Sequence, residues 1–407
     1  MKNNIKVTVV GLGYIGLPTA AVIASKNIKV FGYDVNEKVV SKVNKGEIHI
    51  IEPGLKSIVS NSVKKGFLSA DIKVNKSDVY IIAVPTPFKL NNKPDTSYIE
   101  NATTNIIPVL KNGDLFIIES TSPIGTTEKI MNLIFKERPD LVGNIFISYC
   151  PERVLPGNIL HELVYSDRVI GGIDEKSTKK SITFYRNFVK AELHPTNART
   201  AEMCKLAENS ARDIQIAFAN ELSIICEEAK IDSNELIKLA NKHPRVNILN
   251  PGCGVGGHCI AVDPYFIISD FPKNSNLIQT ARKVNNNKSE WCLNQIIKSK
   301  DEFEIENNKK PKIAVLGLSY KANIDDLRES PAEYIAKKLA KIISPSNLFV
   351  CEPNIERHDA FTIKKYHEAV KICDIIVLLV PHNEFINIEY IKNKKYLDFC
   401  GILKNKI

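Results

Sequence analysis

The first 34 residues narrow the choice of fold more than any other segment. An apolar run at residues 6–10 leads directly into Gly11-Leu-Gly13-Tyr-Ile-Gly16. A helix-forming run at 18–26 and a second apolar run at 29–33 follow, and the second run ends in Asp34. A strand, a GxGxxG turn, a helix and a strand closed by an acid form the dinucleotide-binding unit of a parallel α/β sheet.

Each part of this unit has a chemical task. Gly11 allows the tight turn, Gly13 lets the backbone approach a pyrophosphate, and Gly16 lets the helix pack closely on the strand. The N–H groups and dipole of the helix N-terminus favour the phosphates. Asp34 is expected to hold the ribose hydroxyls, and because no arginine follows it, NAD is favoured over NADP. Cofactor contacts are thus predicted at Gly11, Gly13, Tyr14, Ile15, Gly16 and Asp34.

Two more apolar runs, residues 78–84 and 114–118, continue the pattern of a parallel sheet. Hydroxyl-rich loops follow both runs, and ligands of open parallel sheets lie at the carboxyl ends of strands. Thr86 and Thr127 are therefore predicted to contact the cofactor, although turn and capping chemistry alone would also explain them. Ser122, followed by a proline, is expected to cap the next helix.

Composition excludes several classes of protein. With 407 residues, two or three domains are expected, and 44% hydrophobic with 25% charged residues is typical of globular chains. The net charge of +9 comes from scattered lysines without a basic stripe, which disfavours nucleic-acid binding and suits a small anionic ligand. Nine cysteines without a CxxC pair indicate a reducing compartment and no zinc site.

Residues 7–24 carry no charge and resemble a signal peptide or a marginal membrane span. Three glycines and Pro18 inside this run argue against both. We therefore expect a soluble cytoplasmic protein without a membrane partner.

The middle of the chain combines a long helix with a glycine loop. Residues 198–229 have helical periodicity without a breaker, and Lys205, Asn209 and Arg212 fall on one face, for which a solvated surface is the simpler interpretation. Cys259 closes a loop with four glycines in six residues. A cysteine there is commonly a buried apolar residue, but it can also add to an aldehyde, hold the adduct for oxidation and leave from a thioester.

The last hundred residues repeat the opening pattern in a degenerate form. An apolar run at 312–316 leads into Gly317-Leu-Ser-Tyr320-Lys321, with a helix expected from about Ser330 and a strand at 348–351. Because Ser319 and Ala322 replace the second and third glycines, close approach of a pyrophosphate is not expected here.

Five strings make the whole chain resemble one family. They are CPERVLPG (150–157), RTAEMCKLAENS (199–210), HPRVNIL (243–249), GVGGHCIAVDP (254–264) and NIDDLRESPA (323–332). These strings are similar to the UDP-glucose/GDP-mannose dehydrogenase family, and most similar to its branch acting on UDP-N-acetyl-D-mannosamine. The resemblance implies an α/β fold with two Rossmann-like domains, built on parallel sheets, that flank a central all-helical domain. The predicted boundaries are 1–196 for NAD, 197–300 for dimerisation and the reactive lysine and cysteine, and 301–407 for the UDP-sugar.

The resemblance also implies a reaction. The sugar C6 alcohol would be oxidised to a carboxylate by two NAD+, in a pathway to cell-surface polysaccharide. Cys259 matches the nucleophile that forms a thiohemiacetal and then a thioester. Lys205, helped by Asn209, matches the group that stabilises the alkoxide, and Asp263 and Glu152 match residues that position or activate water.

The remaining implied contacts concern the ligands and a partner copy. The active site would lie between domains, with Arg328 reaching the cofactor, and the helical middle would form a homodimer. His243 and Arg245 would enter the partner's site. The implied substrate contacts are Arg153, Val154, Lys205, Asn209, Arg212, His243, Arg245, Gly256, Tyr320 and Lys321.

Two departures from the family bear on the substrate. Val262 stands where enzymes specific for UDP-glucose carry a lysine, which argues against UDP-glucose. Cys400 stands where relatives carry a basic residue, which puts one substrate contact in doubt. The alternatives are a UDP-N-acetylglucosamine 6-dehydrogenase, a two-electron hydroxyacid dehydrogenase, and a sensor that binds NAD or a sugar nucleotide without catalysis.

Overall fold

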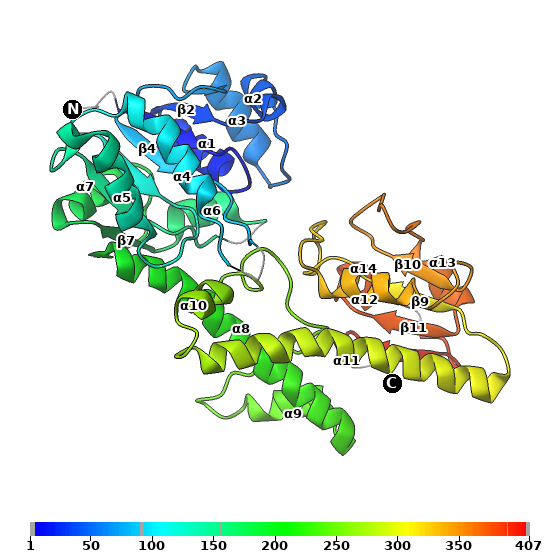
Figure 1. Cartoon of the computed structure of the whole chain (residues 1–407). Helices are drawn as coiled ribbons and strands as arrows, with labels where there is room; N and C mark the ends of the chain where they lie inside the picture. The colour runs from blue at the N-terminus through cyan, green and yellow to red at the C-terminus, as the bar shows by residue number, and fades with distance from the viewer. Residues whose placement is uncertain (1–4, 90–92, 155–156, 389, 404–407) are drawn as a thin grey trace. The chain divides into compact units, whose positions relative to one another are not determined.

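The computed structural model describes residues 5–89, 93–154, 157–388 and 390–403 (Figure 1). The chain divides into two compact units, Met1–Ala207 and Glu208–Ile407, and each is described by itself. Within the described residues, no helix combines the length and the apolar character that crossing a membrane would need.

An eight-stranded sheet organises the first unit. Its strand order is β3-β2-β1-β4-β5-β6-β7-β8, and every neighbouring pair is parallel except β6 with β7. The order reverses direction between β1 and β4, where Rossmann folds bind their ligand. The strands are β1 (Lys6–Val10), β2 (Lys29–Tyr33), β3 (Leu68–Asp71), β4 (Val79–Ile82), β5 (Leu115–Ile118), β6 (Phe146–Tyr149), β7 (Arg168–Gly172) and β8 (Leu193–Asn197).

Helices cover both faces of this sheet because alternate strand residues are apolar on both sides. Val79 and Ile81 of β4 join the core under α1, α3, α6 and α7, whereas Tyr80 and Ile82 join the core under α4 and α5. The helices are α1 (Gly16–Ser25), α2 (Glu37–Asn44), α3 (Leu55–Lys64), α4 (Ser97–Ile106), α5 (Thr126–Glu137), α6 (Ile159–Tyr165) and α7 (Glu175–Tyr185).

Packing within the chain requires glycine at two of the three glycine positions of the turn. Gly11 has φ +87°, and a Cβ there would lie 2.6 Å from the carbonyl oxygen of Ala83. A Cβ on Gly16 would lie 1.7 Å from the carbonyl oxygen of Gly11. A Cβ on Gly13 would meet nothing within 4 Å, so internal packing does not require glycine there.

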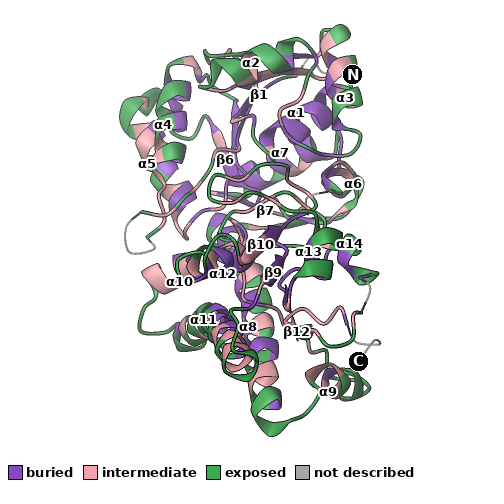
Figure 2. Ribbon diagram, turned by 90° about the vertical axis from the view of Figure 1, so that its right-hand side faces the viewer, coloured by how far each residue is buried: buried purple, intermediate pink, exposed green. Residues whose placement is uncertain are grey.

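The charge-free run at residues 7–24 is the strand, turn and helix of this unit. Residues Gly16 to Ala24 of α1 are all buried, which Figure 2 shows as a purple helix beside the sheet. Burial on every side explains why α1 lacks the polar face of a surface helix. The predicted strands 6–10 and 29–33 are confirmed as β1 and β2.

The cap predicted at Ser122 is wrong. Helix α5 begins at Thr126, after Gly125 with φ +88°, and the Ser122 hydroxyl donates to the carbonyl of Ser120. The carboxylate of Glu202 accepts the N–H groups of Gly125 and Thr127 instead, at 2.6 and 2.7 Å. A carboxylate 75 residues away in sequence thus takes the capping role, which no local pattern indicates.

The long helix predicted at 198–229 is confirmed as α8, which begins in the first unit and ends in the second. In the second unit, a parallel sheet of order β10-β9-β11-β12 is covered by α11 and α12 on one face and by α13 and α14 on the other. The polar stretch after residue 297 continues α11 to Asn307. The elements are α8 (Ala198–Ala229), α9 (Ser233–Ala240), α10 (Pro264–Asp270), α11 (Asn276–Asn307), β9 (Ile313–Leu316), α12 (Pro331–Leu339), β10 (Leu348–Cys351), α13 (Tyr366–Ile372), β11 (Ile375–Leu378), α14 (Asn383–Ile386) and β12 (Lys395–Asp398).

Replacing Gly16 with alanine should destabilise the protein, because its Cβ would overlap the Gly11 carbonyl. Overpacking of this kind costs about 1–3 kcal/mol, and each kcal/mol lowers Tm by roughly 2–4 °C in a unit of this size. Gly13→Ala is the matched control and should leave Tm within a degree or so, since its Cβ meets open space. Equal Tm values for the two variants in thermal unfolding would contradict this account of the turn.

Candidate active site

The first part of the site lies where β1 and β4 end. Asp34 Oδ2 accepts the N–H of Leu12 at 2.9 Å, and Oδ1 accepts the N–H of Asn36 at 2.9 Å. Gly13 and Tyr14 are exposed, and Ile15 precedes a first turn of α1 that receives no side-chain cap from the described residues. Open space over Gly13 beside an ionisable carboxylate and uncapped N–H groups fits a dinucleotide.

The two predicted threonines differ in their surroundings. Thr86 is half-buried in the loop after β4. Thr127 is fully buried, and its hydroxyl donates to Glu202 Oε1 at 2.6 Å. Burial raises the pKa of Glu202, with the hydrogen bonds from Thr127 acting in the opposite direction. In this structure the hydroxyl of Thr127 therefore serves the cap of α5, and its contact with the cofactor stays a prediction.

Glu152 and Lys205 meet in the first unit. Lys205 Nζ donates to the carbonyl oxygen of Glu152 at 2.7 Å. The Glu152 side chain is almost completely buried, and its carboxylate accepts the N–H of Arg153 at 2.7 Å and the guanidinium of Arg168 at 3.1 Å. Arg153 is exposed, whereas Val154 packs against the core under α1. The predicted lysine and glutamate are thus in direct contact.

Cys259, Asp263 and Asn209 meet in the second unit. The carbonyl of Cys259 accepts the N–H groups of Val262 and Asp263 at 2.9 and 2.8 Å, so the cysteine closes a tight turn in front of α10. The amide of Asn209, on α8, donates to the buried carboxylate of Asp263. Hydrogen bonds therefore link three predicted catalytic residues, two in the turn and one on α8.

The glycine loop at residues 252–257 packs against Tyr320 and Glu329. A Cβ on Gly256 would lie 2.6 Å from the carbonyl oxygen of Glu329 and 2.7 Å from Tyr320 Cβ, so only glycine fits. The N–H of Gly257 donates to the carbonyl of Arg328 at 3.0 Å. The structure therefore brings Gly256 to Tyr320 and to the segment that carries Arg328.

The side chains of Arg328 and Lys321 differ in their surroundings. Arg328 donates to Asp326, with Nη2–Oδ2 at 2.6 Å, and this contact lowers the pKa of Asp326 although burial opposes it. Lys321 is exposed.

A cavity of about 510 Å³ lies between α8 and the loop that follows α9. Arg212 is exposed at its wall, and Asn241 clamps the loop by exchanging hydrogen bonds with the backbone of Ile248 at 2.9 and 2.7 Å. His243 and Arg245 are also exposed, with the N–H of Arg245 donating to His243 Nδ1 at 3.3 Å. The three asparagines of the lining, Asn241, Asn247 and Asn250, escaped prediction because isolated asparagines in a loop give no pattern.

The second Rossmann-like turn is closed by an internal carboxylate. Buried Glu352, directly after β10, accepts the N–H groups of Leu318 and Ser319 at 2.7 and 3.1 Å. His382 Nε2 lies 3.0 Å from the same carboxylate oxygen. These contacts use the groups that a pyrophosphate would need, in agreement with the expectation drawn from the missing glycines.

Cys400 is half-buried, and burial raises the pKa of its thiol. Its N–H donates to Asp398 Oδ1 at 3.1 Å. A neutral thiol cannot supply the cation that relatives carry at this position, so the corresponding substrate contact is not expected here.

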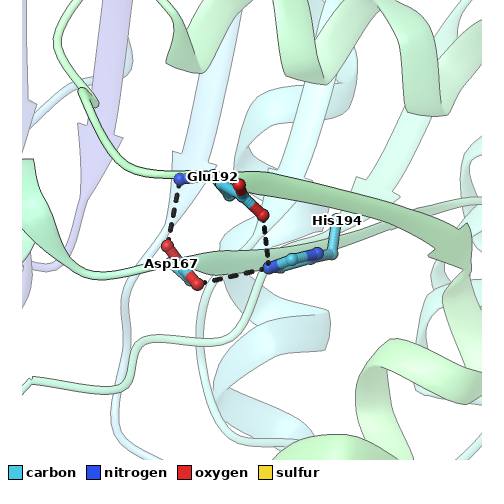
Figure 3. A group of neighbouring side chains, drawn as sticks. All are labelled: Asp167, Glu192 and His194. Atoms are coloured by element: carbon cyan, nitrogen blue, oxygen red, sulfur yellow. Dashed lines mark hydrogen bonds and ion pairs between the residues drawn. The ribbon is translucent and has the colours of Figure 1, made fainter.

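Three exposed side chains form a group at the amino-terminal ends of β7 and β8 (Figure 3). They are those of Asp167, Glu192 and His194. The N–H of Glu192 donates to Asp167 Oδ1 at 3.0 Å, and His194 Nε2 lies 3.4 Å from Asp167 Oδ2. The hydrogen bond from Glu192, followed by that from His194, lowers the pKa of Asp167. These contacts hold the first residues of β7 and β8 together.

Comparison with known proteins agrees with this geometry. Residues 5–189, 199–287 and 314–405 match the NAD binding, central and UDP binding domains of the UDP-glucose/GDP-mannose dehydrogenase family. The chain is 50% identical to the UDP-N-acetyl-D-mannosamine dehydrogenase of Campylobacter jejuni, over 97% of this chain and 99% of that protein. It is 46% identical to the NDP-N-acetyl-D-galactosaminuronic acid dehydrogenase of Ralstonia nicotianae, over 98% and 96%.

A solved structure extends the likeness to the fold. The UDP-D-ManNAc dehydrogenase of Pyrococcus horikoshii superposes with a TM-score of 0.89 at 38% identity, over 98% of this chain and 96% of that one. The chain therefore belongs to the UDP-glucose/GDP-mannose dehydrogenase family, as an NAD-dependent UDP-sugar dehydrogenase.

Proposed function

We propose that the chain oxidises the C6 hydroxyl of UDP-N-acetyl-D-mannosamine to a carboxylate through a thioester on Cys259. One sugar alcohol, two NAD+ and one water would give one carboxylate, two NADH and three protons. The observation that carries this proposal is the set of contacts at Asp263, which bonds the carbonyl of Cys259 through its N–H and Asn209 through its carboxylate.

NAD, when bound, accepts one hydride from the sugar in each of the two oxidations. The residues that would hold it are Asp34, at the ribose hydroxyls, and the exposed backbone of Gly13 and Tyr14, at the pyrophosphate. Asp34 has acceptor capacity left for a ribose, because each carboxylate oxygen accepts one hydrogen bond from the described residues and can accept another. Thr86, Thr127 and Arg328 complete the proposed cofactor contacts.

The first oxidation releases the hydroxyl proton to solvent and develops negative charge on the C6 oxygen. We assign the stabilisation of this charge to Lys205, whose Nζ donates to the Glu152 carbonyl. The Asn209 amide would donate to the same C6 oxygen. Cys259 Sγ then adds to the aldehyde carbon, giving a thiohemiacetal that the second hydride transfer converts to a thioester.

Hydrolysis completes the reaction. A water oxygen bonds to the thioester carbon, the Sγ–C bond breaks, and the cysteine returns to its thiol form. Glu152 would accept the proton of this water, and Asp263, held by Asn209, would orient it. Two carboxylates with fixed hydrogen-bond partners suit this step because neither must reorganise.

Substrate choice is assigned to the loops of the second unit. Arg245 and His243 are exposed donors, and Val262 removes the lysine of enzymes that act on UDP-glucose. The names of the 50% and 38% identical relatives support N-acetylmannosamine. The 46% identical relative makes an N-acetylgalactosamine nucleotide a second candidate substrate. Substrate contacts are proposed at Arg153, Val154, Lys205, Asn209, Arg212, His243, Arg245, Gly256, Tyr320 and Lys321.

We further propose a cytoplasmic homodimer that forms through the central helices and supplies cell-surface polysaccharide synthesis. Phe218 and Ile225 lie seven residues apart on one face of α8 and are 53% and 55% exposed. Leu239 on α9 is 61% exposed. Large apolar side chains gathered on neighbouring helices suit a partner surface better than water.

Asp34→Ala should weaken NAD binding by roughly ten- to hundredfold, since a hydrogen bond to a charged group contributes about 1.5–3 kcal/mol. NADP use should change less, because the carboxylate repels a 2′-phosphate. Titration calorimetry measures the Kd of each of the two cofactors. Asp71→Ala is the matched control, because Asp71 ends the neighbouring strand β3 and is exposed. An unchanged Kd for NAD in Asp34→Ala would remove Asp34 from the cofactor site.

Cys259→Ser should abolish formation of the acid and leave NAD binding intact, because a serine hydroxyl without a strong base is a far weaker nucleophile. Cys253→Ser is the control, since Cys253 is buried and burial raises the pKa of its thiol to about 12. Chromatography of the products from each variant decides the matter. Acid production by Cys259→Ser at the wild-type rate would exclude covalent catalysis.

A panel of UDP-sugars with NADH detection tests the substrate. Each acetamido group or protein partner left unpaired costs about 1–3 kcal/mol, so two losses should favour UDP-N-acetylmannosamine over UDP-glucose by on the order of hundreds-fold. Arg245→Ala should raise KM or lower kcat for the sugar without altering NAD affinity, whereas Lys242→Ala, at a neighbouring exposed cation, should not. Equal rates on UDP-glucose, or preference for another epimer, would overturn the assignment.

A further inference from the structure

A cluster of buried charges lies under Glu152. We call it the Arg168 cluster, and it consists of Glu119, Cys150, Glu152, Arg168 and Tyr185. Glu119 follows β5, Cys150 and Glu152 follow β6, Arg168 begins β7, and Tyr185 ends α7. All of these elements belong to the first unit.

The reversal of β7 creates this cluster. Because β7 is antiparallel to β6, its first residue lies beside the carboxyl ends of β5 and β6. The pairing of Tyr149 with Gly171, continued along both chains, sets Glu152 opposite Arg168. A parallel β7 would have placed this arginine at the opposite edge of the sheet.

Arg168 is only 3% exposed and contacts every neighbour in the cluster. Its Nη2 donates to Glu152 Oε2 at 3.1 Å, and its Nη1 lies 3.9 Å from Glu119 Oε1. Nη1 also lies 3.8 Å from Cys150 Sγ, and the guanidinium lies 5.1 Å from the ring centre of Tyr185. The carbonyl of Leu163 on α6 is 3.5 Å from Nη2.

The carboxylates of Glu119 and Glu152 both lie near the guanidinium of Arg168, but their surroundings differ. Burial raises the pKa of Glu119 to about 7, with Arg168 lowering it and Glu152 raising it further. The Tyr185 hydroxyl donates to Glu119 Oε1 at 2.6 Å. Because Arg168 lies 3.1 Å from Glu152 and 3.9 Å from Glu119, its ion pair is chiefly with Glu152.

We propose that Arg168 is a positioning residue for thioester hydrolysis, which acts by fixing the Glu152 carboxylate in place. The inference rests on the proposed function, in which Glu152 accepts the proton of the attacking water. Glu152 Oε1 is held by the N–H of Arg153 and Oε2 by Arg168, so the carboxylate cannot rotate freely. Its backbone carbonyl at the same time holds Lys205.

The cation is needed because Glu152 is almost completely buried. A buried charge is stable only where it is paired and hydrogen-bonded. The other groups that face Glu152 do not supply a second cation inside the cluster, since Glu119, Cys150 and Tyr185 are acids or neutral. Lys205 is bonded to the backbone oxygen of Glu152.

The test compares NADH formation with release of the acid in single turnovers, by stopped flow and rapid quench. In Arg168→Met we expect NADH formation to change less than about threefold and acid release to slow by ~10–100-fold, the lower part of the range for general-base catalysis. Arg168→Lys keeps the charge with fewer donors, so its rate of acid release should be intermediate.

Arg282→Met is the matched control. Arg282 forms a similarly buried ion pair with Asp213, with Nη1–Oδ1 at 2.7 Å, outside the proposed catalytic residues. It should reduce Tm without changing the ratio of acid release to NADH formation. If Arg168→Met slows NADH formation and acid release in equal proportion, or if both arginine variants change that ratio alike, Arg168 is only structural and the inference is overturned.

Two further outcomes keep the test decisive. Should Arg168→Met fail to fold, Arg168→Lys decides alone: slower acid release at an unchanged rate of NADH formation supports the inference, and two unchanged rates overturn it. Mass spectrometry of quenched wild-type enzyme checks the proposed function separately. Absence of an acyl group on Cys259 during turnover would overturn the thioester mechanism and, with it, the role of Arg168.

Discussion

The contact of Gly16 with the carbonyl of Gly11 sets the position of α1 against β1, and the cofactor site depends on it. A Cβ at Gly16 would lie 1.7 Å from that oxygen, so the helix approaches the strand only because Gly16 lacks a side chain. Close approach leaves the backbone at Gly13 open and aims the first turn of α1 at the same space. The tie from Asp34 to the N–H of Leu12 then joins β2 to the turn.

The two Rossmann-like sheets show how one architecture is assigned to different ligands. In the first unit Asp34 accepts one N–H of the turn, that of Leu12, and one from Asn36. In the second, Glu352 accepts two N–H groups and is itself held against His382. A longer acid and the loss of two glycines thus convert a pyrophosphate cradle into a closed turn, which agrees with the match of this region to a UDP binding domain.

Local patterns predicted the local structure well, whereas contacts set by topology escaped them. Strands β1 and β2 and helix α8 follow from apolar runs and periodicity within single segments. The cap of α5 by Glu202 and the pairing of Glu152 with Arg168 depend on which strands are neighbours and in which direction they run. The resemblance therefore supplied Asn209, Asp263, Lys205 and Glu152 as predictions, but it did not supply Arg168, which holds Glu152.

The central claim is a four-electron oxidation at one cysteine, and counting NADH per sugar tests it most directly. A limiting amount of UDP-N-acetylmannosamine should yield two NADH per sugar and an equal amount of uronic acid, without free aldehyde. A yield of one NADH with accumulation of aldehyde would mark a two-electron dehydrogenase and contradict the account.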